Sequence, residues 1–179
     1  MTSISEFSGS ELELLISLPY KVGVFVSYAD DEGGERDDEK EMAALEACIK
    51  AIARLHEDKP FTAEVMQQTL AMKSEWGNWA AQSFGTPDAA GQAAALLSAR
   101  ASDTEQKNYK AALMEIASTV AQAYGEFGEF EDESEGGLAG LIGKITGGLS
   151  KLSGDDADHP MNVSAAEDSA IEQLRAALS

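Results

Sequence analysis

Two acid-rich stretches carry the residue types in this chain that are best suited to chemistry. Residues 30–41 read DDEGGERDDEKE, and residues 126–135 read EFGEFEDESE. Clustered carboxylate oxygens are the ligands that hard cations such as Ca²⁺ and Mg²⁺ prefer. The first stretch has acids at the first, third, ninth and twelfth places of an EF-hand count, but Glu35 occupies the sixth place, where the sharp turn requires glycine. The sequence therefore predicts acidic, cation-compatible connections that are not EF-hands.

A structural explanation of the same acids stays open. Asp and Glu in the first turn of a helix are stabilised by the helix macrodipole and need no ligand for this. Acids elsewhere on the surface serve solubility.

The two acidic stretches belong to an internal repeat with an offset of 96 residues. The offset places acids on acids, pairing Asp30 with Glu126, Glu35 with Glu131, and Glu39 with Glu135. The apolar and aromatic positions match as well: Leu18 with Met114, Val24 with Val120, Tyr28 with Tyr124, Met42 with Leu138, Leu45 with Leu141, and Ile49 with Ile145. The repeat predicts a duplicated helix–acidic loop–helix unit.

Helical periodicity dominates the chain, and no alternating strand pattern is convincing. We expect an all-α bundle of about 6–8 helices with an internal pseudo-two-fold repeat. A first helix follows the capping boxes at Ser8 and Ser10 and is kinked at Pro19. A second ends near His56, Thr62 caps a third, and Thr86-Pro87 begins another.

The expected domain spans residues 8–152, with repeat units at about 10–56 and 104–152. For residues 136–154 the sequence predicts a helix that is weakened by its glycines, because each helical glycine costs about 0.8–1 kcal/mol relative to alanine. Residues 153–179 predict a linker and a C-terminal helix that begins at a Ser164–Glu167 capping box. The sequence leaves open whether that helix docks on the bundle.

The composition restricts the partners and the location. The net charge of −19 argues against nucleic acid, because the phosphate backbone is repelled. The N-terminus has no secretory signal pattern and no apolar run is long enough to span a bilayer, so we expect a cytoplasmic protein. We also expect a protein partner. Peripheral membrane contact and the oligomeric state stay open.

Catalytic motifs are missing from the sequence. His56 and His159 fall in no triad or metal spacing, and His56 is expected to be a helix cap or solvated. Cys48 lies in an apolar helical stripe and is expected to be a buried thiol, and Trp76 and Trp79 are expected to be core residues. We predict a non-enzyme without an organic cofactor.

The segment VSYADDEGG, followed by a helix with Glu39, Met42 and Leu45, resembles the TerB-like family of tellurite-resistance proteins, and VAQAYGEFGEFEDE is a looser second copy. The family shows an alanine-aspartate-glycine step, from which Ala29-Asp30-Asp31-Glu32-Gly33 departs by two inserted acids. The resemblance covers about residues 10–150. It implies an all-α bundle with an accessory role in bacterial stress response and an acidic surface that binds divalent cations. The residues that it implies as metal ligands are Asp30, Glu35, Glu39, Glu126, Glu131 and Glu135.

Two functional hypotheses follow. The first is a helical binding or scaffold protein that holds calcium or magnesium at its acidic connections. The second is an acidic protein–protein adaptor without a metal site, docking through its Gly-rich helix or its C-terminal helix.

Overall fold

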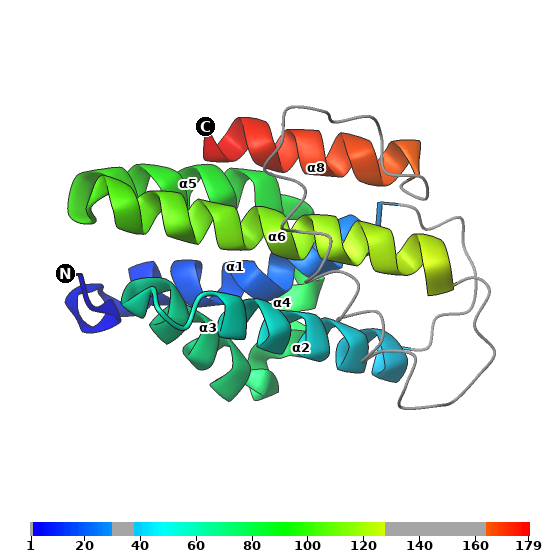
Figure 1. The fold of residues 1–179 in the computed structure, drawn as a ribbon, viewed down its shortest axis with the longest axis horizontal. Helices are drawn as coiled ribbons and strands as arrows, with labels where there is room; N and C mark the ends of the chain where they lie inside the picture. Colours follow the sequence, from blue (N-terminus) through cyan, green and yellow to red (C-terminus); the bar gives the residue numbers. More distant parts are fainter. Residues whose placement is uncertain (1, 30–37, 128–163) are drawn as a thin grey trace.

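The computed structural model describes residues 2–29, 38–127 and 164–179, and this part of the chain is all-α (Figure 1). The side chains of residues 38–41 and 123–127 fall outside the description. The α-helices are α1 (Gly9–Ser27), α2 (Asp38–Leu55), α3 (Pro60–Ala71), α4 (Trp76–Ala81), α5 (Thr86–Arg100), α6 (Asp103–Phe127) and α8 (Ala165–Leu178). Short 3-10 turns η1 (Ile4–Glu6), η2 (Lys73–Glu75) and η3 (Ser83–Gly85) complete the described elements. The expected all-α bundle is confirmed.

Helix α1 lies in the centre and packs against α2, α3, α4, α5, α6 and α8. Its buried residues come from every side of the helix, as its nearly continuous apolar sequence predicts: Leu15, Ile16, Ser17, Leu18, Pro19, Tyr20, Val22, Gly23, Val24 and Val26. Gly23 allows α2 to approach closely, because a Cβ atom there would lie 2.2 Å from Leu45 Cδ1. The core is thus organised around the first helix.

The directions of the helices follow from side-chain contacts. Thr2 donates from its backbone N–H to Glu105 at 2.7 Å, which places the beginning of α6 beside the N-terminal segment that precedes α1. Tyr109 contacts Leu15 further along both helices, so α1 and α6 run in the same direction. Arg100 at the end of α5 meets Glu11 at the beginning of α1, so α5 runs in the opposite direction.

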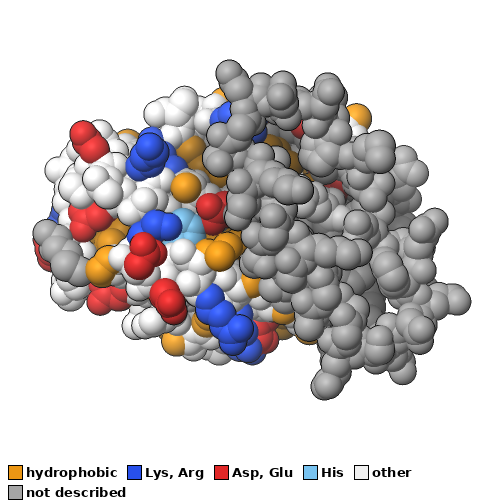
Figure 2. All heavy atoms as spheres, viewed as in Figure 1, with side chains coloured by type: hydrophobic (Ala, Val, Ile, Leu, Met, Phe, Trp, Pro, Cys, Tyr) orange, Lys and Arg blue, Asp and Glu red, His pale blue; other side chains and the backbone are white. Residues whose placement is uncertain are grey.

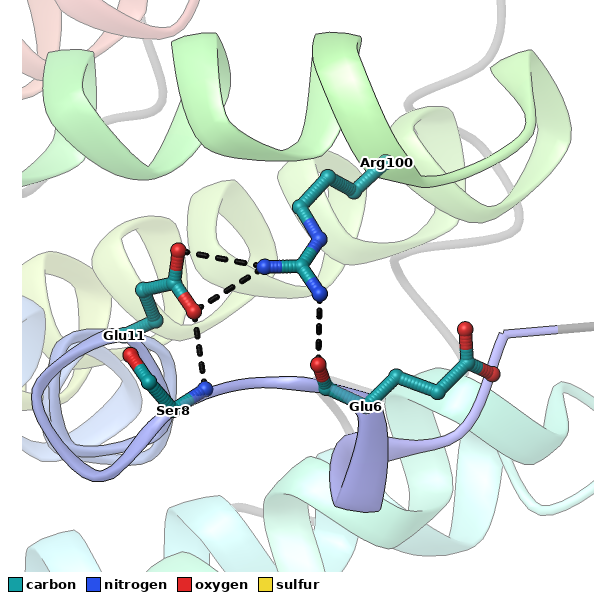
Figure 3. A network of polar contacts seen from close by, with 4 residues as sticks. All are labelled: Glu6, Ser8, Glu11 and Arg100. Atoms are coloured by element: carbon teal, nitrogen blue, oxygen red, sulfur yellow. Dashed lines mark hydrogen bonds and ion pairs between the residues drawn. The ribbon is translucent and has the colours of Figure 1, made fainter.

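The N-terminal segment is fixed by Arg100 (Figure 3). Its Nη1 donates to both carboxylate oxygens of Glu11, at 3.1 and 3.0 Å, and its Nη2 donates to the carbonyl oxygen of Glu6. The guanidinium carbon lies 5.0 Å from the centroid of the Phe7 ring. Glu11 also accepts from the backbone N–H of Ser8, and this bond together with that to Arg100 lowers the pKa of Glu11. One arginine therefore ties η1, α1 and α5 together.

The region 60–85 is more broken than its periodicity predicts. The third helix begins at Pro60, so the predicted cap at Thr62 is wrong, and Thr62 is buried within α3. Proline fixes φ and lacks the N–H that the first turn of a helix leaves unbonded, which explains the early beginning. Trp76 and Trp79 fall in the separate short helix α4, after the chain turns at Met72.

Helix α8 packs on α5 and α6 and reaches α1. The predicted capping box is confirmed: Ser164 N–H donates to Glu167 Oε2 at 3.0 Å, and Glu167 N–H donates to Ser164 Oγ at 3.2 Å. Its buried apolar residues are Ala170, Ile171, Leu174 and Leu178. The C-terminal helix is therefore part of the packed structure.

Only part of the predicted repeat lies within the described residues. The first helix of the first unit corresponds to α1, and the first helix of the second unit corresponds to most of α6. These two helices pack in parallel. Val24 and Val120 are both buried, whereas Met114, the counterpart of buried Leu18, is half-buried. The second helix of the second unit lies within residues 128–163, outside the described residues, so the duplication stays a prediction.

Candidate functional site

The described helix ends next to the acidic stretches lie at one end of the bundle. Figure 1 shows the end of α1, the beginning of α2 and the end of α6 together at the same end of the molecule. This follows from the parallel course of α1 and α6 and from the reversal of the chain between α1 and α2. Both predicted acidic connections are therefore attached to the same end of the scaffold.

The predicted ligands themselves are not placed by the structure. Asp30, Glu35, Glu131 and Glu135 lie outside the described residues. Glu39 belongs to the first turn of α2 and Glu126 to the last turn of α6, and the description does not extend to their side chains. Among the described residues, no three His, Cys, Asp or Glu side chains come together in a way that could hold a metal ion.

His56 is the histidine that the structure places. It follows the last residue of α2 and its backbone N–H donates to the carbonyl oxygen of Ile52 at 3.1 Å, as expected of a cap, whereas the predicted alternative of a solvated side chain is wrong. Its side chain is only 3% exposed, and its Nε2 lies 2.6 Å from Oε2 of Glu115 in α6. The other ring nitrogen, Nδ1, is buried and has no hydrogen-bond partner among the described residues. The pair joins the end of α2 to the middle of α6, with the imidazole buried and the Glu115 side chain 27% exposed.

The two tryptophans are core residues, as predicted. Trp76 is fully buried, stacks on Tyr20 with ring centroids 4.4 Å apart, and donates from Nε1 to the carbonyl oxygen of Thr69 at 3.0 Å. Trp79 is 1% exposed. Neither ring presents a face on which a ligand could stack.

Cys48 is buried, as predicted. Burial raises the pKa of its thiol to about 12, against a smaller opposing effect of the neighbouring Thr119. A thiol with this pKa carries almost no thiolate at neutral pH, and the thiolate is the nucleophilic form. Cys48 therefore has the properties of a packing residue.

The described surface mixes charges of both signs. On the face shown in Figure 2, basic and acidic side chains are interspersed with apolar ones and do not gather into one acidic patch. Ion pairs contribute to this mixture, such as Lys73 with Glu46, whose pKa is lowered chiefly by hydrogen bonds from Lys50 and Lys73. Exposed pairs of this kind contribute little to stability.

The class that the fold defines is an all-α bundle arranged around a buried first helix. Comparison of the chain with protein-family models, with curated proteins and with solved structures found no match. None of the described helices is long and apolar enough to cross a membrane.

Proposed function

We propose that the chain is a non-enzymatic α-helical binding or scaffold protein that holds a divalent cation with the acids of its two connections. The observation that carries this proposal is the position of the helix ends: those that flank both acidic stretches lie at one end of the bundle (Figure 1). The role in bacterial stress response, of the tellurite-resistance kind, rests on the resemblance to TerB-like proteins.

The distribution of the acids supports a cation site at this end. Of the 32 acids in the chain, eight lie in residues 30–41 and six lie in residues 126–135. Calcium takes six to eight oxygen ligands, which carboxylates, backbone carbonyls and waters can supply. Two acidic stretches attached to one end of a rigid scaffold could supply carboxylates to the same ion, and the cation would offset their mutual repulsion.

The described chemistry supports a non-enzymatic role. The groups that most often act as nucleophile or base, Cys48 and His56, are buried in packed contacts between helices. A general base must come within hydrogen-bond reach of its substrate, and neither residue is accessible to one.

The experiment is thermal unfolding of the chelator-treated full chain with and without millimolar calcium, magnesium, manganese or zinc. A cation present at about 100 times its dissociation constant adds roughly 2.7 kcal/mol to the free energy of unfolding. We expect a rise in melting temperature that saturates with one or two of these ions. An equal, small rise with every ion would favour the metal-free adaptor.

Substitutions locate the effect. Asp30→Asn, Glu35→Gln and Glu39→Gln together, or Glu126→Gln, Glu131→Gln and Glu135→Gln together, should remove most of the rise. The control combines Glu13→Gln, Glu57→Gln and Asp58→Asn, which removes the same charge from exposed positions on other parts of α1 and beyond the end of α2. A control that loses the rise equally would show that overall charge, and not a site, causes it.

The structure bears on the alternative of a metal-free adaptor that docks through its C-terminal helix. The apolar face of α8 is buried on α5 and α6, so this face cannot bind a partner while α8 stays in place. The Gly-rich segment 136–154 lies outside the described residues.

A further inference from the structure

No further inference is drawn: the strongest candidate, the His56–Glu115 side-chain pair between the end of α2 and the middle of α6, gives no direction of pH dependence, because the 2.6 Å contact with the carboxylate favours the charged imidazole whereas burial of the ring and the lack of a partner for Nδ1 among the described residues favour the neutral one.

Discussion

The hydroxyl group of Tyr109 donates a hydrogen bond to the carbonyl oxygen of Leu15 at 2.8 Å, in the buried interface of α6 and α1. In an uninterrupted helix, this carbonyl would accept from the N–H four residues on, but that residue is Pro19, which has none. The side chain of Tyr109, 94 residues further along the chain, thus donates the hydrogen bond that the Leu15 carbonyl cannot receive from Pro19. This bond explains how a proline persists inside the central helix.

Replacing Tyr109 with phenylalanine should lower the free energy of unfolding by about 1–3 kcal/mol, because a buried carbonyl loses its donor. Urea unfolding followed by circular dichroism measures this loss. In a Pro19→Ala background, which restores the backbone N–H, the same substitution should cost less. An equal cost in both backgrounds would contradict the coupling between Tyr109 and Pro19.

Glu105 should make the stability depend on pH in acid. Partial burial opposes its ionisation, but four hydrogen bonds from Ser102 and Thr2 outweigh this and lower its pKa from 4.5 to about 2. Because the pKa is lowered in the folded state, the carboxylate stabilises the protein above pH 4.5, and this contribution is lost as the pH falls towards 2.

The measurement for Glu105 is urea unfolding at several pH values. Glu105→Gln should be less stable than the wild type at pH 7, and the two should converge as the pH falls to about 2. The control is Glu57→Gln, which removes one exposed carboxylate. A constant gap between Glu105→Gln and wild type at every pH would refute the role given to ionisation.

The single cysteine should report on opening of the core. Cys48 is buried between helices and its pKa is raised to about 12, so a thiol reagent should react with the native chain far more slowly than with the urea-unfolded chain. The reaction rate should rise in step with unfolding as urea is added. Rapid reaction without urea would show that this part of the core is open.

Gly23→Ala should destabilise the fold by roughly 1 kcal/mol, although alanine favours helix, because the new methyl group would overlap the Leu45 side chain. Thermal unfolding measures the change. Leu45→Ala removes the overlapping atoms, so it should cost less in the Gly23→Ala chain than in the wild type. Strictly additive effects of the two substitutions would argue against the close approach of α1 and α2.

The sequence predicted what depends on local pattern. Helical spacing and capping residues, such as Ser164 with Glu167, are properties of neighbouring residues, and they located most helices. The burial of Cys48 and of the two tryptophans also follows from their place in apolar stripes.

The sequence could not predict contacts between distant residues. His56 and Glu115 are 59 residues apart, and nothing in the periodicity of either helix pairs them. The same holds for Tyr109 and Leu15. Thr62 was misassigned as the cap because a good capping residue competed with Pro60, whose fixed φ favours a helix that begins three residues earlier. The candidate cation ligands remain predictions from the sequence, supported by the position of the helix ends.

The most direct test of the cation proposal is calorimetric titration of the chelator-treated chain with calcium and then with magnesium. The proposal predicts saturable binding of at least one ion, weakened at least tenfold by neutralising the acids of either connection and unchanged by Glu13→Gln, Glu57→Gln and Asp58→Asn. The absence of saturable binding heat for both ions would contradict the proposal. Saturable binding that is unchanged in both variants with neutralised connections would contradict it as well.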